Sequence, residues 1–174
     1  MKHKLLLLYT WLIRTLLFFL PDIPFIMRFR GWLYSFGMKQ CGKNFQVSHN
    51  VILNGLEGMK VGNNVFINNN NIFIVTSGIT INDNVIIGPS CVFSSSNHIY
   101  RNGSFRFAKG EGRPVVVGKG SWIAANCTIL AGAIIPEESI VAAGAVYNEI
   151  QPAKLISKAV YGGVPAKFIK SLQL

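Results

Sequence analysis

The feature of this sequence that most constrains its fold is an apolar residue that returns at every sixth position. In the second half of the chain these residues are Val117, Ile123, Ile129, Ile135, Val141 and Tyr147. A small residue follows the first five of them by four places, at Ser121, Cys127, Ala133, Ser139 and Ala145. A period of six fits neither an α-helix, with about 3.6 residues per turn, nor an alternating strand, with a period of about 2. It fits a solenoid in which each hexad forms a short strand and a corner, with the bulky residue inside and the small residue in the crowded turn.

The same register recurs nearer the N-terminus at Val61, Ile67, Ile81, Ile87 and Phe93, with fourth-place partners Val85, Cys91 and Asn97 after the last three. We therefore predict a β-solenoid over residues 44–163. The register breaks between His98 and Val117, in a polar, Gly-rich segment with four basic residues, Arg101, Arg106, Lys109 and Arg113. This break predicts a projecting loop over residues 99–116, and long loops on a rigid scaffold often carry function.

The hexads resemble those of the hexapeptide-repeat acyltransferases, whose pattern is aliphatic-Gly-x-x-small-x. The run WIAANCTILAGAII, which begins at Trp122, is similar to the WIGANVTILPGVTIG signature of that family. The resemblance covers about residues 44–170. It implies an all-β fold, a left-handed parallel β-helix with three hexads to a coil of about 18 residues, and a short C-terminal helix over residues 164–174.

Residues 1–43 have a different character and predict amphipathic helices. The apolar run from Leu5 to Leu20, interrupted by Arg14, reaches only about 24 Å as a helix, short of the roughly 30 Å hydrocarbon core of a bilayer. No cleavage site of small residues follows it, so we read the segment as retained. Together with the stretch Phe25–Phe36, it suits helices in a membrane interface, and residues 1–36 are a candidate peripheral membrane contact. Helices that cap the solenoid or pack in an oligomer would show the same pattern.

The formal net charge of +10 favours an anionic partner: a phosphorylated cofactor, an acidic sugar or an anionic lipid. Nucleic acid is disfavoured, because no zinc-finger spacing, recognition-helix pattern or RNA-binding aromatic motif is present. The three cysteines, Cys41, Cys91 and Cys127, are an odd number at unrelated spacings, which argues against a disulfide framework and indicates a reducing compartment. Two of them occupy small inward positions and are interpreted as packing residues.

Only three histidines are available as a base, His3, His49 and His98. They do not have the spacing of a zinc site, so no metal is expected. His98 ends the hexad that begins at Phe93 and stands directly before the basic loop. A corner histidine of this kind is either solvated or catalytic, and the neighbouring loop favours catalysis.

The resemblance extends to the maltose, galactoside and sialic-acid O-acetyltransferases, whose catalytic histidine precedes such a loop, and it implies that His98 is the general base. Trp122, at the end of its own hexad, resembles a tryptophan that lines the site near that histidine; packing on the cofactor or loop is the alternative. Asn69 matches the acceptor-binding asparagine, although the run of asparagines around it is also typical of turns. Asn97, beside His98, is the second substrate-binding candidate. The family's acidic residue after the asparagine is missing, because Thr76, Ser77 and Gly78 stand there.

The C-terminal run GGVPAKFIK, which begins at Gly162, resembles the GNPAKVI close of the family. The resemblance implies that Lys167 and Lys170, one turn apart on the expected helix, face the phosphates of acetyl-CoA. Ala125 and Ala143 match the small positions where the family backbone binds the pantetheine arm. Asn148-Glu149 replaces a common Thr-Lys pair, so phosphate contacts there are expected to differ.

These observations predict an acetyl-CoA-dependent O-acetyltransferase that acts on a sugar of a capsular, lipopolysaccharide or exopolysaccharide component. The family resemblance implies a homotrimer with active sites between subunits, and a cytoplasmic location, on the inner face of the membrane if the N-terminal helices bind lipid. Two alternatives remain open: an N-acetyltransferase of an amino sugar nucleotide, and a noncatalytic β-helix scaffold.

Overall fold

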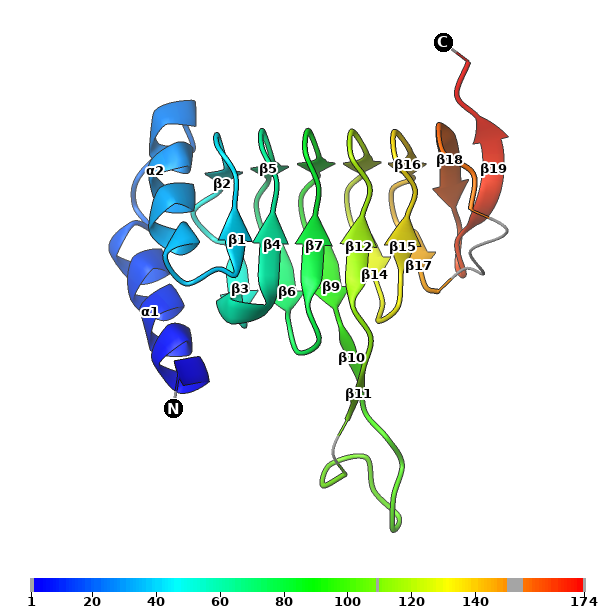
Figure 1. The fold of residues 1–174 in the computed structure, drawn as a ribbon, viewed down its shortest axis with the longest axis horizontal. Coiled ribbons are helices and arrows are strands. Elements are labelled where there is room, and N and C mark those ends of the chain that lie inside the picture. Colours follow the sequence, from blue (N-terminus) through cyan, green and yellow to red (C-terminus); the bar gives the residue numbers. More distant parts are fainter. Residues whose placement is uncertain (1, 109, 150–154, 174) are drawn as a thin grey trace.

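The structure is a computed structural model that describes residues 2–108, 110–149 and 155–173. Short parallel strands stack into a left-handed β-helix, and two helices close its N-terminal end (Figure 1). The helices are α1 (Lys2–Leu16) and α2 (Pro24–Ser35), and a 3₁₀ turn, η1, spans Leu56–Gly58. Among the described residues, no helix combines the length and apolar character needed to cross a bilayer.

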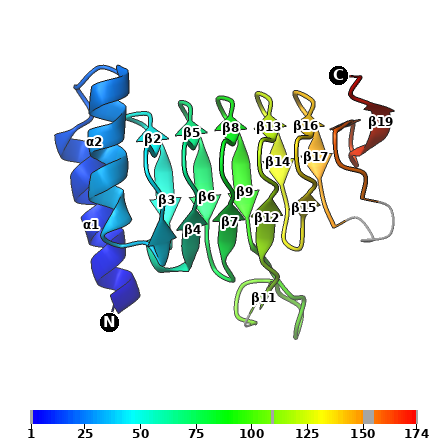
Figure 2. The ribbon, with the colours of Figure 1, turned by 45° about the horizontal axis from the view of Figure 1, so that its top comes forward.

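The strands of the solenoid form three sheets, one on each side of a triangular prism (Figures 1 and 2). The first sheet contains β1 (Gln40–Cys41), β4 (Met59–Val61), β7 (Ile79–Ile81), β12 (Val115–Val117) and β15 (Ile134–Ile135). The second contains β2 (Gln46–Val47), β5 (Phe66–Ile67), β8 (Ile86–Ile87), β13 (Trp122–Ile123), β16 (Ile140–Val141), β18 (Ala159–Gly162) and β19 (Lys167–Ser171). The third contains β3 (Ile52–Asn54), β6 (Ile72–Ile74), β9 (Val92–Ser94), β14 (Thr128–Ile129) and β17 (Val146–Tyr147).

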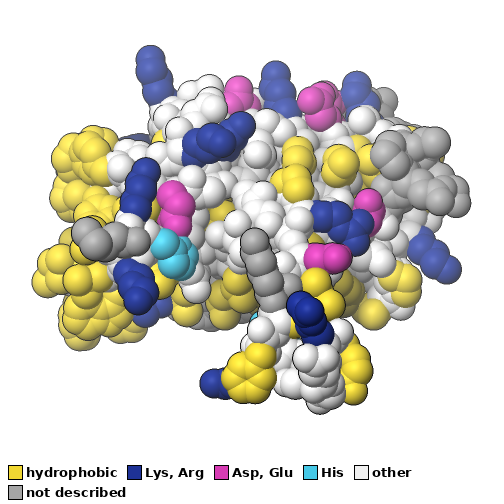
Figure 3. Space-filling view, turned by 60° about the horizontal axis from the view of Figure 1, so that its bottom comes forward, with side chains coloured by type: hydrophobic (Ala, Val, Ile, Leu, Met, Phe, Trp, Pro, Cys, Tyr) yellow, Lys and Arg dark blue, Asp and Glu magenta, His cyan; other side chains and the backbone are white. Residues whose placement is uncertain are grey.

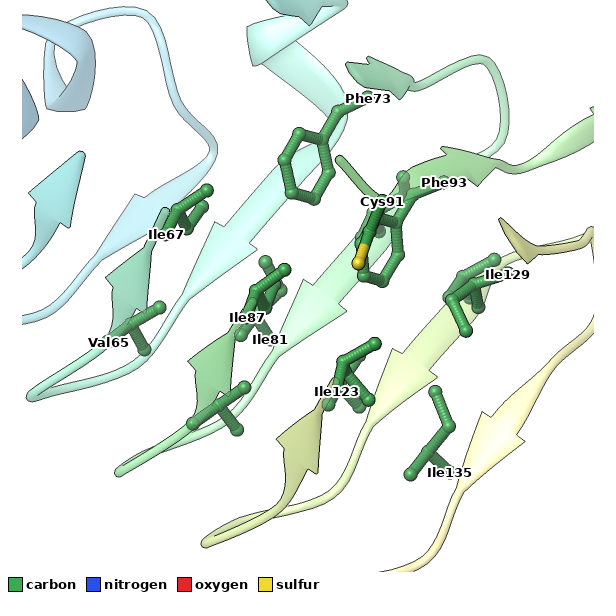
Figure 4. Packing of buried hydrophobic residues seen from close by; sticks show 14 of the residues in the cluster. Val65, Ile67, Phe73, Ile81, Ile87, Cys91, Phe93, Ile123, Ile129 and Ile135 are labelled. Atoms are coloured by element: carbon green, nitrogen blue, oxygen red, sulfur yellow. The ribbon is translucent and has the colours of Figure 1, made fainter. Parts of the chain in front are cut away.

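The core of the prism is built from the hexad residues, as the periodicity predicts. Each apolar hexad residue from Val117 to Tyr147 is at most 1% exposed, and so are the small residues Ser121, Cys127, Ala133, Ser139 and Ala145. Equivalent residues of successive coils stack on one another. For example, Phe73 lies on Phe93 with ring centroids 4.7 Å apart (Figure 4). Burial of this continuous apolar column is the main stabilising contribution to the fold.

Coil length departs from the 18 residues that the family pattern implies. Gln40 pairs with Lys60, and Lys60 with Thr80, so the coils before the loop contain 20 residues; Val116 pairs with Ile134, so the next coil contains 18. The two additional residues lie at the corner between the third and first sheets, which we call the loop corner (residues 55–58, 75–78 and 95–114). Gly55 and Gly78 adopt positive φ angles there, a conformation that glycine accepts without a steric penalty.

The projecting loop is a β-hairpin whose bounds differ from the predicted 99–116. Its stem pairs β10 (Ser96–Asn97) with β11 (Glu111–Gly112), and Val115 has already rejoined the first sheet. Asn97 therefore lies exposed on the stem, and the expectation that it fills an inward position is wrong. Ser95 takes the buried position instead, because its hydroxyl oxygen accepts hydrogen bonds from the backbone N–H groups of Thr76 and Ser77, at 2.9 and 3.0 Å.

The N-terminal helices pack on the first coil, which shows that their inner faces are a structural cap. Helix α2 contacts β2, and α1 contacts β3 and η1. Arg30, only 1% exposed, joins the two helices to the solenoid: its guanidinium donates to Asp22 Oδ1 at 2.6 Å, Leu20 O at 2.5 Å and Val47 O at 3.3 Å. Asp22 also accepts from the backbone N–H of His49 at 3.0 Å and contacts its ring. Burial acts to raise the pKa of Asp22, but the hydrogen bonds from His49 and Arg30 outweigh it and lower that pKa.

The expected C-terminal helix over 164–174 is wrong. Residues Lys167–Ser171 form β19, which runs antiparallel to β18 and ends the second sheet. Strand β18 would otherwise expose an unpaired edge, and β19 covers it, with Phe168 set edge-on to Tyr161. Residue 174 lies outside the described part of the chain.

Candidate active site

His98 directly follows the first strand of the hairpin stem, and its side chain is exposed. A tight turn at Asn102-Gly103 forms part of this hairpin. The two residues have φ angles of 50° and 80°, and Arg101 and Ser104 pair across the turn. An Asn-Gly pair suits such a turn because both positions need positive φ. The hairpin therefore holds His98 outside the solenoid, beside the loop corner.

The hairpin surrounds His98 with aromatic and basic side chains. His98, Phe105, Arg106 and Phe107 line an open depression of about 570 Å³. The Arg106 guanidinium lies 5.7 Å from the centroid of the Phe107 ring, and Tyr100 packs on Phe105. Hydrophobic and basic side chains of the hairpin stand out from the body of the molecule in Figure 3. This setting suits a ligand with both apolar and anionic parts.

A second depression lies at the base of the hairpin, on the first-sheet side of the loop corner. It measures about 480 Å³, and its lining includes Lys39, Lys60, Ser77 and Thr80. The residues that replace the family's acidic position lie here, and Thr76 Oγ1 donates to Ser96 Oγ on the stem at 3.2 Å. In the described residues neither lysine is paired with a carboxylate. Sequence reasoning missed Lys39 and Lys60, because lysines twenty-one positions apart become neighbours only when 20-residue coils stack.

Trp122 lies on the second sheet and is 48% exposed, with Ile86 and Ile140 beside it on neighbouring strands. The second sheet is opposite the loop corner in the prism, and Figure 2 places β11 of the hairpin away from β13. Within one chain, the structure therefore does not bring Trp122 to His98.

Ala125 and Ala143 occupy equivalent places at the corner between the second and third sheets, where Gly144 N donates to Ala125 O at 2.9 Å. We call residues 88–90, 124–126 and 142–144 the small-residue edge. Among the described residues, the backbone N–H groups of Ala125 and Ala143 donate to no other group. An edge of small side chains whose backbone N–H groups lack an acceptor in the described residues fits the extended, amide-containing arm of a pantetheine.

Asn69 lies at the same corner, in an earlier coil, and differs from its neighbours in the asparagine run. Asn68, Asn70 and Asn71 all engage in side-chain hydrogen bonds within the turn or to adjacent coils. Asn69 Oδ1 is buried and has no hydrogen-bond partner among the described residues. The turn interpretation therefore holds for those three neighbours. The structure places Asn69 nearer to the small-residue edge than to His98, which lies at the loop corner.

Lys167 and Lys170 are exposed on β19, not one turn apart on a helix. Val146 N donates to Gly163 O, so the turn before β19 continues the line of the small-residue edge. The two lysines thus lie at the C-terminal end of the solenoid beside that edge, while Lys109 lies outside the described residues.

The cysteines and potential metal ligands add no second centre. Cys91 and Cys127 are buried, as expected, and the Cys91 thiol donates to Ala124 O at 3.0 Å. Interaction with Cys127 and burial raise the pKa of Cys91. No cluster of three His, Cys, Asp or Glu side chains suitable for a metal occurs in residues 2–108, 110–149 and 155–173.

The fold is one that solved hexapeptide-repeat acetyltransferases share. The structure resembles a hexapeptide-repeat acetyltransferase from Vibrio cholerae with a TM-score of 0.84 and 24% identity, over 99% of this chain and 94% of that chain. The Vibrio cholerae protein is also known as a complex with acetyl-CoA.

Two further solved structures are similar. A galactoside acetyltransferase in complex with coenzyme A matches with a TM-score of 0.81 and 21% identity, over 98% of this chain and 82% of that one. A maltose O-acetyltransferase from Clostridium difficile 630 matches with a TM-score of 0.76 and 24% identity, over 98% and 90%. No family model matches the sequence.

Proposed function

We propose that the protein is an acetyl-CoA-dependent O-acetyltransferase that acts on a sugar hydroxyl. The observation that carries this proposal is His98, exposed beside a hairpin that leaves a hexapeptide solenoid at one corner. The fold match to acetyltransferases supports it. Acetyl-CoA is the co-substrate, and the reaction needs no metal.

In the proposed reaction, His98 acts as general base. It takes the proton of the acceptor hydroxyl as the oxygen attacks the thioester carbonyl; the new C–O bond forms and the C–S bond breaks. The same proton then passes from His98 to the CoA thiolate, so no acyl-enzyme forms. The hairpin contributes by holding the imidazole outside the prism, where two substrates have access.

Acetyl-CoA is proposed to lie along the small-residue edge. The outward N–H groups of Ala125 and Ala143 would donate to pantetheine carbonyls, and side chains larger than alanine would block this contact. Lys167 and Lys170, at the C-terminal end of the same edge, would bind phosphate. Trp122 precedes Ala125 on the adjoining strand, so its indole would cover the thioester end.

This arrangement requires two copies of the chain, because His98 lies at the loop corner and Trp122 on the opposite sheet. We propose that the hairpin of one subunit brings His98 to the small-residue edge of the next, in a homotrimer. Three identical solenoids with parallel axes would then form three such sites, each shared by two subunits.

The acceptor is proposed to be an acidic or phosphorylated sugar of a capsular, lipopolysaccharide or exopolysaccharide precursor. Lys39 and Lys60, in the depression at the base of the hairpin, supply the positive charge, and Glu57, the carboxylate in the same lining, is engaged by His3. Asn97 on the stem and Asn69 at the edge are the proposed polar contacts to the sugar. Because the reaction uses acetyl-CoA, we place the protein in the cytoplasm.

The test is release of the CoA thiol by the full chain, with acetyl-CoA and panels of hydroxyl sugars, amino sugar nucleotides or no acceptor. We expect turnover with a hydroxyl sugar and a decrease of about 10²–10⁴-fold in His98→Ala. His3→Gln, which alters another exposed histidine, is the matched control and should keep full turnover. Acetylation of only amino sugars would assign the N-acetyltransferase, and no turnover with any acceptor would assign a noncatalytic scaffold.

A further inference from the structure

Each N-terminal helix carries two apolar stripes rather than one. The inner stripe packs on the solenoid through residues such as Ile13, Met27 and Tyr34. The outer stripe repeats every three or four residues and is exposed: Leu5, Leu8, Leu12 and Leu16 on α1, with Phe19 just beyond it, and Phe25, Phe29 and Trp32 on α2, with Phe36 just beyond it. A helix at a water-exposed surface needs only the inner stripe, so the outer one indicates a second apolar surrounding.

The outer stripes form one surface at the N-terminal end of the molecule, which we call the cap face. Because both helices pack their inner sides on the first coil, their outer sides point away from the solenoid. Figure 3 shows hydrophobic side chains gathered at this end, well apart from the hairpin. Phe19 and Phe25 are 90% and 73% exposed. The Phe29 ring stacks on Trp32 with centroids 5.9 Å apart, and Phe36, just beyond α2, meets Trp32 edge-on at 4.9 Å.

The charges around the cap face are positive. Lys2, Lys4 and Arg28 are exposed, and Arg14 is half-buried. The single carboxylate in residues 2–36 is Asp22, which is already bound to Arg30 and His49. Aromatic side chains bordered by basic ones match the headgroup region of an anionic bilayer. Against a second copy of the same face, the lysines and arginines would repel one another.

We propose that the cap face docks on the surface of an anionic lipid bilayer, with both helices lying in the interface. Helix α1 contains 15 residues and is about 22 Å long, shorter than the roughly 30 Å hydrocarbon core, so it lies on the membrane rather than across it. The inner stripe still caps the solenoid, so the same helices have both roles. This inference is independent of the proposed acetyl transfer.

The test is cosedimentation of the full chain with vesicles of phosphatidylcholine alone or mixed with phosphatidylglycerol. We expect binding to the mixed vesicles and at least tenfold weaker partitioning of Phe19→Gln/Phe25→Gln, because two large apolar side chains no longer enter the interface. The control is Ile156→Gln/Val164→Gln, which changes two exposed apolar residues at the other end and should bind like the wild type. Lys2→Gln/Lys4→Gln/Arg28→Gln should remove the preference for phosphatidylglycerol.

Three results would overturn the proposal. The first is failure of the wild type to sediment with either vesicle, and the second is equal binding by Phe19→Gln/Phe25→Gln and its control. The third is a smaller mass of Phe19→Gln/Phe25→Gln in light scattering without lipid, since that would make the cap face an interface between copies. Circular dichroism of each variant verifies that the solenoid is folded, so weak binding is not mistaken for unfolding.

Discussion

The corner between the second and third sheets differs in the two halves of the solenoid. In the early coils polar side chains fill it: Asn50 and Asn70 bond across coils, and buried Asn71 donates to Asn68 O and Gly88 O while accepting from Cys91 N. In the late coils the same corner carries Ala125 and Ala143, and their backbone N–H groups have no acceptor among the described residues. The corner is thus tied together by asparagine side chains in one half, and in the other half it carries backbone donors that the described residues leave unpaired.

This contrast teaches that polar side chains alone do not mark the site. The asparagine run of the early coils attracts attention in the sequence, yet most of its hydrogen bonds join one coil to the next. The alanines and glycines of the late coils have no side-chain chemistry, and this lack leaves their backbone available. Substitutions in the two halves should therefore affect different properties.

The largest effect is expected from a bulky residue on the small-residue edge. Ala125→Trp should weaken acetyl-CoA binding by at least about 1,000-fold, or about 4 kcal/mol, because the indole would cover the proposed path of the pantetheine. Isothermal titration calorimetry measures this change, and Ala125→Ser is the matched control. Tight binding by Ala125→Trp would place the cofactor elsewhere.

The reciprocal substitution in the early half should affect stability instead. Asn71→Ala removes the four hydrogen bonds of a fully buried side chain and should lower the free energy of unfolding by about 3 kcal/mol. Acetyl-CoA affinity should stay unchanged, because Asn71 bonds to Gly88 of the small-residue edge and not to Ala125 or Ala143, the proposed donors to the cofactor. Denaturant unfolding measures the stability of Asn71→Ala, and calorimetry measures its affinity for acetyl-CoA. If Asn71→Ala lost affinity for acetyl-CoA without losing stability, the contrast between the two halves would be wrong.

At the capped end, Asp22→Asn should lower the free energy of unfolding by about 2 kcal/mol at neutral pH, since buried Arg30 loses its charged partner. The pKa of Asp22 is lower in the folded chain than in the unfolded one. Its contribution is therefore present above the unfolded pKa, near 3.9, and is lost as the pH falls through the folded value. Acid titration of stability should show this loss in the wild type and not in Asp22→Asn. The same decrease of unfolding free energy at acid pH in both proteins would contradict this role of Asp22.

The smallest effect is expected at β19. Lys167→Ala and Lys170→Ala should each weaken acetyl-CoA by about 1 kcal/mol, seen mainly as a higher KM. Dephospho-CoA is the control: the wild type should discriminate against its acetyl form and the double variant should not. Equal discrimination by both proteins would assign the 3′-phosphate to other residues.

Much of the fold follows from the sequence, because the hexad period directly sets which side chains fill the prism. The two additional residues of each early coil interrupt that period only at the loop corner, so the strands of successive coils stay in register. Asn97 lies at this corner, on the hairpin stem, and is therefore exposed although the hexad period predicts an inward position. The C-terminal strand could not be predicted from the local pattern. Residues Lys167–Ser171 are extended because their backbone pairs with the edge of β18, a contact that the local sequence does not encode. The burial of Arg30 could not be predicted either, because it depends on carbonyl groups of residues 17–21 and of Val47, which the fold brings together.

The candidate site was predictable residue by residue but not in its assembly. His98, Ala125 and Trp122 are each identifiable from motif position, whereas their separation on the prism follows from the order of the sheets. Lys39 and Lys60 become neighbours only through coil stacking. Residues this far apart in the sequence show no local pattern that would predict their contact.

The central claim is that His98 and the small-residue edge act together from different subunits. Coexpression of His98→Ala with Ala125→Trp, followed by isolation of mixed oligomers through two affinity tags, tests it directly. Each variant alone should be inactive, and each mixed trimer should regain one of its three sites, the one that joins an intact hairpin from one chain to an intact edge from its neighbour. Acetyl transfer that stays at the level of the single variants would contradict the claim and return both parts of the site to one chain.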